Sequence, residues 1–189
     1  LDILLSIMAL IILIPFFILI GIWIALESKG GVFFTQERVG KGERIFHLYK
    51  LRSMKMGSEA KGLLTVGGRD PRITKSGYYL RKYKLDELPQ LFNILKGDMS
   101  LVGPRPEVKK YVDLYDCRQR KVFEIRPGLT DYASLEYIKE NEILSQSAHP
   151  EETYIQEIMP AKLELNLKYM EEQSLATDFN ILWKTAVKI

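Results

Sequence analysis

The chain has 189 residues, of which 47% are hydrophobic and 27% charged, so it fits one folded domain and is not a disordered chain. A single cysteine, Cys117, excludes an internal disulfide and indicates a reducing compartment, and the lack of a His/Cys cluster argues against structural zinc. The net charge of +3 is uneven, since residues 29–126 carry +11 and residues 127–189 carry −6. The basic middle suits phosphorylated substrates, acidic headgroups or nucleic acid, with a merely solvated basic surface as the alternative.

Residues 3–26 form an uncharged apolar run that is long enough to cross about 30 Å of hydrocarbon as a helix. The run is too long for a signal peptide, and no small-residue cleavage site follows it. Pro15 stands in its middle and predicts a kink or break, because proline removes a backbone donor and clashes with the preceding turn. Two topologies follow: a kinked helix that spans the membrane, or one that leaves by the face it entered. Basic residues after the run place that end in the cytoplasm (Lys29, Arg38, Lys41 and Arg44).

The next segments read as a small mixed domain. Two β-prone runs, 32–36 and 45–49, predict a hairpin, and the polar, glycine-containing residues 55–75 predict a loop. A short basic helix is expected over 76–84. The strongest helix pattern covers 86–96, with Asp86 as the N-cap and Gly97 as the terminator.

Loops are predicted at 99–106 and 126–130, and a helix over 151–172 that is interrupted at Pro160. Thr177 is expected to cap a last helix that could lie on a membrane surface through one apolar face (Phe179, Leu182, Trp183 and Ala186). The expected fold class is therefore α/β and α-rich: a short hairpin and membrane-surface helices, pressed against the bilayer.

A pair of carboxylates marks the first candidate site. Asp86 and Glu87 follow the basic run 81–84 at a predicted helix start, where free N–H groups favour phosphate and an ionised carboxylate. Such an aspartate can act as a nucleophile that forms an acyl phosphate, or as a ligand for magnesium. The alternative is that Asp86 only caps the helix and Glu87 only complements its dipole.

A second candidate is Arg105, which stands between Pro104 and Pro106. The two prolines stiffen the loop that presents the guanidinium, and arginine suits bidentate phosphate binding. Arg126, before Pro127 and a glycine, repeats this pattern more weakly. Either could instead be a surface arginine in an ordinary turn. The chain contains no phosphate-binding P-loop, no dinucleotide fingerprint and no Ser/His/Asp set, and its apolar segment argues against nucleic acid as a partner.

Several contiguous motifs carry a family resemblance. The run KLDELPQLFN at 84–93, followed by LKGDMSLVGPRP at 95–106, closely resembles the bacterial sugar transferases, which are monotopic polyprenyl-phosphate phosphoglycosyl transferases. The segments FTQERVG at 34–40, YKLRSM at 49–54 and RPGLT at 126–130 match in the same order. The resemblance covers nearly the whole chain.

The resemblance implies a re-entrant membrane helix over 1–28, broken at Pro15, and a cytoplasmic catalytic domain over 29–189, at the bacterial inner membrane. It also implies transfer of a sugar 1-phosphate from a UDP-sugar to polyprenyl (undecaprenyl) phosphate, with release of UMP, as the first membrane step of glycoconjugate biosynthesis. Asp86 would be the nucleophile of a two-step reaction and Glu87 its partner in a dyad, assisted by Mg²⁺. Expected phosphate or nucleotide contacts are Arg81, Arg105 and Arg126, with Lys50 and Arg52 as further candidates.

Three positions depart from the family pattern. Ile14 replaces the serine that often precedes the mid-helix proline, Asp131 stands where glycine is common, and Asn166 replaces a late acidic residue. Alternative functions are a transferase for another nucleotide base, a hydrolase of the same donors, or a non-enzymatic adaptor that binds anionic lipids or glycan-assembly partners. A sealed carboxylate pair would favour the adaptor, and a homo-oligomer is compatible with all of these functions.

Overall fold

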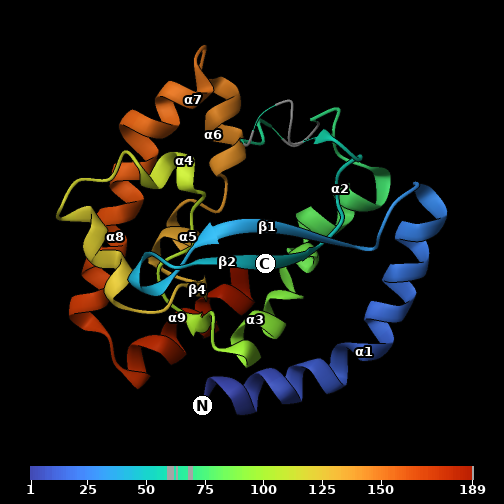
Figure 1. Cartoon of the computed structure of the whole chain (residues 1–189), viewed down its shortest axis with the longest axis horizontal. Coiled ribbons are helices and arrows are strands. Elements are labelled where there is room, and N and C mark those ends of the chain that lie inside the picture. The colour runs from blue at the N-terminus through green and yellow to red at the C-terminus, as the bar shows by residue number, and fades with distance from the viewer. Residues whose placement is uncertain (59–61, 63, 68–69, 189) are drawn as a thin grey trace.

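The computed structural model describes residues 1–58, 62, 64–67 and 70–188. The described chain is rich in helix, with two small sheets, which confirms the α-rich α/β class (Figure 1). The strands are β1 Phe33–Val39, β2 Ile45–Leu51, β3 Ser100–Val102 and β4 Gly128–Thr130. The α-helices are α1 Asp2–Glu27, α2 Lys75–Lys82, α3 Gln90–Lys96, α4 Lys109–Val112, α5 Tyr132–Glu136, α6 Glu140–Gln146, α7 Pro150–Thr153, α8 Met159–Glu172 and α9 Leu175–Lys188. Short 3₁₀ turns are η1 Lys41–Glu43, η3 Leu85–Glu87 and η4 Gln119–Glu124, and η5 Tyr154–Ile158 is a π-helical turn.

Helix α1 is the apolar segment. Its helical structure continues through Pro15, but the helix bends about midway along its length (Figure 1). The predicted kink is therefore present, whereas the helix is not interrupted there. Among the described residues, α1 is the helix long and apolar enough to cross a membrane, and only Ser6, Leu10 and Ile24 in it are buried. Most of its apolar side chains thus have no protein to cover them.

Both ends of α1 are attached to the same domain. At the start, the Ser100 hydroxyl donates a hydrogen bond to the Asp2 carboxylate at 2.5 Å. At the end, the Glu27 carboxylate accepts hydrogen bonds from the backbone N–H groups of Lys75 and Ser76, at 2.6 and 2.8 Å, and so caps α2. Between these ends, Leu10 packs into the core beside α3. Contacts with the domain therefore hold α1 on both sides of Pro15.

The predicted hairpin is present and longer than expected. Strands β1 and β2 pair antiparallel from Phe33 opposite Leu51 to Val39 opposite Ile45, so residues 37–39 belong to the strand. Asn93 in α3 ties the hairpin to the domain, because its side chain accepts from the Tyr49 N–H at 3.0 Å and donates to the His47 carbonyl at 2.8 Å. The hairpin lies between α1 on one side of the molecule and α7 and α8 on the other (Figure 1).

The two predicted loops meet through the short parallel strands β3 and β4. Their backbones come so close at Gly103 and Gly128 that side chains cannot fit. A Cβ atom at Gly103 would lie 2.5 Å from the Arg126 carbonyl oxygen, and one at Gly128 would lie 2.1 Å from the Gly103 nitrogen. Glycine at both positions is therefore required to bring the two loops together.

The C-terminal helices differ in detail from the prediction. The helix expected over 151–172 is divided into α7, the π-helical turn η5 and α8. The predicted interruption is therefore the wider π turn, and Pro160 lies just after it in the first turn of α8. Ser174, not Thr177, caps α9: its hydroxyl accepts from the Thr177 N–H at 3.1 Å. The exposed apolar stripe of α9 differs from the one predicted. Leu182 packs against the core, and the exposed apolar side chains repeat every four residues (Leu175, Phe179, Trp183 and Val187).

Candidate active site

The two candidate carboxylates lie in η3, before the helix that was expected to present them. Helix α3 begins only at Gln90, and the Asp86 side chain makes no cap, so the prediction of Asp86 as an N-cap is wrong. The reason is local: the N–H groups of Glu87 and Leu88 bond to the carbonyls of Lys84 and Leu85, and Pro89 has no N–H. The charge at this site therefore comes from neighbouring side chains and not from a helix terminus.

Glu87 is the centre of an ion-pair cluster. Its Oε1 atom lies 3.0 Å from the Lys50 ammonium and also accepts from the Arg105 guanidinium. Burial alone would raise the pKa of Glu87, but Arg105 and Lys50 outweigh burial and hold that pKa well below its usual range. Burial also disfavours the charged form of Lys50 and so lowers its pKa, while the negative charge of Glu87 acts in the opposite direction. Glu87 is thus an ionised carboxylate with two cations beside it.

Asp86 has a different environment from its neighbour. The residue is 4% exposed, and burial, with the Glu87 charge added, raises the pKa of its carboxyl. Lys50, Arg81 and Lys84 act in the opposite direction and favour the ionised form. The adjacent carboxyls therefore differ in their tendency to hold a proton, as is common where two such groups have different roles.

A large cavity opens beside this cluster. Its volume is about 630 Å³, and its described lining comes from the hairpin, η3, the Arg105 loop and helices α2, α5, α6, α8 and α9. Glu87 lines this cavity, whereas Asp86 does not belong to the lining. Among the described residues, the anionic members of the lining are Glu87, Glu107 and Glu140, and the cationic members outnumber them (Arg38, Lys50, Arg52, Lys55, Arg72, Arg81, Lys84, Arg105, Lys162 and Lys188). Such a surface suits an anionic ligand.

The loop that carries Arg105 is held from two directions. The Arg105 side chain contacts Glu87, and its backbone N–H donates to Asp131 Oδ2 at 3.2 Å. Asp131 is fully buried, and its other oxygen caps α5 by accepting from the Ser134 N–H at 2.6 Å. The departure from the family pattern at Asp131 therefore joins the arginine loop to α5.

The other predicted site residues divide into two groups. Arg81 and Lys50 line the cavity, and Arg81 donates to the Thr65 hydroxyl at 2.8 Å. Arg52 also borders the cavity, but its guanidinium donates to the carbonyls of Ile24, Ser28 and Lys29. Its role is to cap the end of α1, because carbonyls at a helix C-terminus favour a cation.

Arg126 does not belong to the described lining of the cavity, and its side chain is exposed. Its backbone carbonyl instead borders the close approach at Gly103. The Arg-Pro-Gly sequence at Arg126 therefore contributes, in this structure, to the packing of β3 on β4.

A further polar network lies in the cavity wall, and it is not part of the site predicted from the sequence. Arg38 donates to Glu107 at 2.9 Å and to Gln36 at 2.8 Å, and Tyr154 donates to the other Glu107 oxygen. These residues are far apart along the chain, so no local pattern could join them. Arg38 does fall within the motif at 34–40, which was the only available signal.

A divalent cation would have few protein ligands here. The described residues contain no group of three or more His, Cys, Asp or Glu side chains suited to a metal. Glu87 is nevertheless an ionised carboxylate in a phosphate-compatible cavity, and its Oε2 atom has no hydrogen-bond partner among the described residues. This donor set fits Mg²⁺, which commonly binds one or two carboxylates together with phosphates of a substrate.

Comparison with known proteins identifies the family of the chain. The sequence pattern of the bacterial sugar transferase family matches residues 1–189, so the chain belongs to that family. It is 39% identical, over 97% of its length, to a UDP-N-acetylgalactosamine-undecaprenyl-phosphate N-acetylgalactosaminephosphotransferase of Aeromonas hydrophila. It is 33% identical, over its full length, to the UDP-glucose:undecaprenyl-phosphate glucose-1-phosphate transferase of Xanthomonas campestris. It is also 33% identical, over 99% of its length, to the protein of the same name from Escherichia coli. The chain spans 41%, 37% and 39% of these three relatives, respectively.

Proposed function

We propose that this chain transfers a sugar 1-phosphate from a UDP-sugar to polyprenyl phosphate and releases UMP. The observation that carries the proposal is the Asp86–Glu87 pair beside a cationic cavity, with Lys50 and Arg105 directly on Glu87. A diphosphate donor matches this charge and volume. The names of the relatives, which specify UDP-sugars and undecaprenyl phosphate, support the same donor and acceptor.

In the first step an Asp86 carboxylate oxygen would attack the phosphorus that bears the sugar. A new bond from Asp86 to this phosphorus forms, and its bond to the oxygen bridging the two phosphates breaks. That oxygen leaves with the electron pair as part of UMP. For this attack the Asp86 side chain has to turn from its buried position toward the cavity that Glu87 already lines.

In the second step an oxygen of polyprenyl phosphate would attack the same phosphorus. The bond to Asp86 then breaks, which regenerates the carboxylate and yields a polyprenyl diphosphate sugar. Arg105 and Lys50 would hold the phosphate charge in both steps, and Arg81 would contact the phosphates from α2. Mg²⁺, held by Glu87 or Asp86 together with the donor phosphates, would neutralise charge on the leaving phosphate.

A sealed carboxylate pair would favour the adaptor hypothesis. Asp86 is buried and does not line the cavity, but Glu87 lines it beside Arg105, so the pair is not sealed as a whole. This arrangement favours an enzyme. A hydrolase of the same donors would share the first step, with water in place of polyprenyl phosphate in the second.

The reaction assay is the direct test of this function. Purified protein incubated with polyprenyl phosphate and a panel of UDP-sugars is expected to release UMP over many turnovers with at least one donor. Without the lipid, release should stop at about one UMP per protein, because only the first step can occur. Continued release of UMP over many turnovers without the lipid would identify a hydrolase. No release from any donor, with a nucleotide-sugar of another base turned over instead, would contradict the choice of UDP.

We further propose that α1 enters and leaves the cytoplasmic leaflet of the inner membrane by one face, with residues 29–189 in the cytoplasm. Asp2 and Glu27 both contact the domain, and a chain that crossed about 30 Å of hydrocarbon could not bring both ends to one side. The exposed stripe of α9, formed by Leu175, Phe179, Trp183 and Val187, would lie on the same membrane surface.

A cysteine-labelling experiment tests the re-entrant topology. Cys117 is exposed and reports the side of the domain, whereas Leu1→Cys in a Cys117→Ser background reports the first end of α1. In intact cells we expect both to resist a membrane-impermeant thiol reagent, and both to react once the inner membrane is permeabilised. Labelling of the Leu1→Cys variant from outside, with Cys117 protected, would establish a spanning helix.

A further inference from the structure

Four buried side-chain atoms of cavity-lining residues have no hydrogen-bond partner within the described part of the chain: Arg38 Nε, Arg52 Nε, Asn166 Oδ1 and Ser134 Oγ. The two that belong to uncharged side chains are Asn166 Oδ1 in α8 and Ser134 Oγ in α5. Asn166 is only 4% exposed, and its amide oxygen has no hydrogen-bond partner among the described residues. Buried polar atoms usually have partners because an unpaired one is costly, so these atoms are positioned for a ligand.

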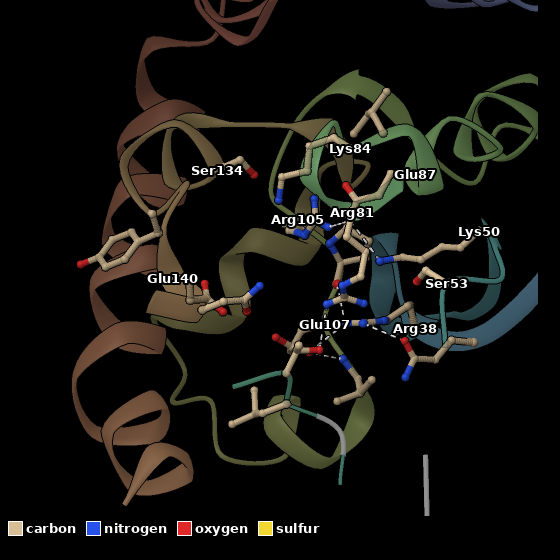
Figure 2. Close-up of a pocket in the computed structure, with 18 of the residues that line it drawn as sticks. Arg38, Lys50, Ser53, Arg81, Lys84, Glu87, Arg105, Glu107, Ser134 and Glu140 are labelled. Carbon is tan, nitrogen blue, oxygen red and sulfur yellow. Dashed lines mark hydrogen bonds and ion pairs between the residues drawn. The ribbon is translucent and has the colours of Figure 1, made fainter. Parts of the chain in front are cut away.

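The surroundings of Asn166 and Ser134 differ in charge from those of Glu87. Ser134 and Glu140 lie on one side of Arg105, whereas Glu87 and Lys50 lie on the other (Figure 2). On the Ser134 side, Glu140 is paired with Lys162 at 2.6 Å, so this ion pair carries no net charge. Lys188 is the further cation near Ser134 among the described lining residues, and its ammonium donates to the Leu135 carbonyl at 3.1 Å. An uncharged ligand rich in hydroxyl groups matches the unpaired donors and acceptors of Ser134 and Asn166.

The aromatic residues at this end pack inward. Tyr154 is buried in the core cluster beneath α8, and Tyr137 packs against the same cluster. Tyr154 therefore supplies no free ring face for stacking a nucleobase, and Tyr137 is only partly buried. The hydroxyl-rich sugar is the uncharged part of the donor that matches the unpaired Ser134 and Asn166 atoms.

We infer that the sugar of the donor binds beyond Arg105, against Ser134, Asn166 and the Glu140–Lys162 pair, and that Asn166 selects among sugars by hydrogen bonding to one of their substituents. This inference rests on the proposed transferase function. Asn166 also borders the small cavity under the Pro104–Glu107 loop, so the side chain lies next to the segment that carries Arg105. The sugar would thus lie next to the phosphate that Arg105 holds.

The test compares selectivity among donors with affinity for UDP, which lacks the sugar that is transferred. For wild type, Asn166→Ala and Ser134→Ala, kcat/KM is measured with the best UDP-sugar of the panel and with its epimer at one carbon. Asn166→Ala is expected to lower kcat/KM for the best donor about tenfold and to bring the ratio between epimers toward one. The Kd for UDP, measured by calorimetry, is expected to change by less than about twofold, which also shows that the variant is folded.

The exposed residue Asn180 in α9 supplies a matched control, and Asn180→Ala should retain the wild-type selectivity. An unchanged epimer ratio in both Asn166→Ala and Ser134→Ala would overturn the inference while the transferase function stands. An equal loss of UDP affinity in Asn166→Ala would overturn it too, because the nucleoside would then occupy this end. Absence of turnover by the wild type with every donor would refute the proposed function itself.

Discussion

Replacing Asp86 by asparagine is expected to lower turnover by at least about 1000-fold, because an amide cannot form the acyl-phosphate bond. The protein should remain folded, since the Asp86 side chain makes no cap and no ion pair within 4 Å in the described structure. Turnover is measured as UMP release, and folding as the thermal unfolding midpoint. Asp113→Asn, which removes an exposed carboxylate at the C-terminal end of α4, is the matched control and should keep wild-type activity.

A trapping experiment separates the roles of the two adjacent carboxylates. Protein incubated with the donor alone and quenched should carry one sugar phosphate, and trypsin should place it on the peptide 85–96, which contains both Asp86 and Glu87. Fragmentation should assign the mass to Asp86, and the adduct should be absent from Asp86→Asn. An adduct on Glu87, which is the carboxylate that lines the cavity, would exchange the two roles.

Removal of divalent metal is expected to lower activity by at least about 100-fold, with full recovery on addition of Mg²⁺. The physical reason is the charge of a diphosphate donor, which must be neutralised as the bond between its phosphates breaks. Glu87 has one carboxylate oxygen without a partner among the described residues, so it can bind a metal while Arg105 and Lys50 occupy the other.

The control for the metal is the Glu87→Gln variant. If Glu87 is a ligand, this variant should need a higher Mg²⁺ concentration for half-maximal activity, whereas Asp113→Asn should not. Undiminished activity in excess EDTA would remove the metal from the mechanism. Lys50, Arg81 and Arg105 would then have to supply the whole positive charge on the phosphates.

The sequence predicted those features that depend on neighbours along the chain. The apolar run, the kink at Pro15 and the termination of α3 at Gly97 all follow from local backbone chemistry and hydrophobicity. The basic middle of the chain predicted a cationic surface, and cationic side chains do line the cavity. The contiguous motifs predicted the family, which the match over residues 1–189 confirms.

Predictions that depended on the end of an element were less accurate. Asp86 resembles an N-cap because a polar residue precedes an apolar helical pattern, but backbone bonds to Lys84 and Leu85 satisfy the N–H groups first. Thr177 likewise resembles a cap, and Ser174 takes that place. Hydrogen-bond competition within a turn decides such positions, and residue preferences alone cannot resolve it.

The sequence by itself determined the family, the apolar helix and the candidate carboxylates, because each of these depends on residues that are contiguous along the chain. Only the tertiary structure decided which arginines serve the site: Arg105 contacts Glu87, whereas Arg52 caps α1 and Arg126 is exposed. The three have the same side chain, and their partners lie 18 to 28 residues away where partners exist. A guanidinium binds whichever acceptors the fold brings to it, and that choice depends on long-range packing.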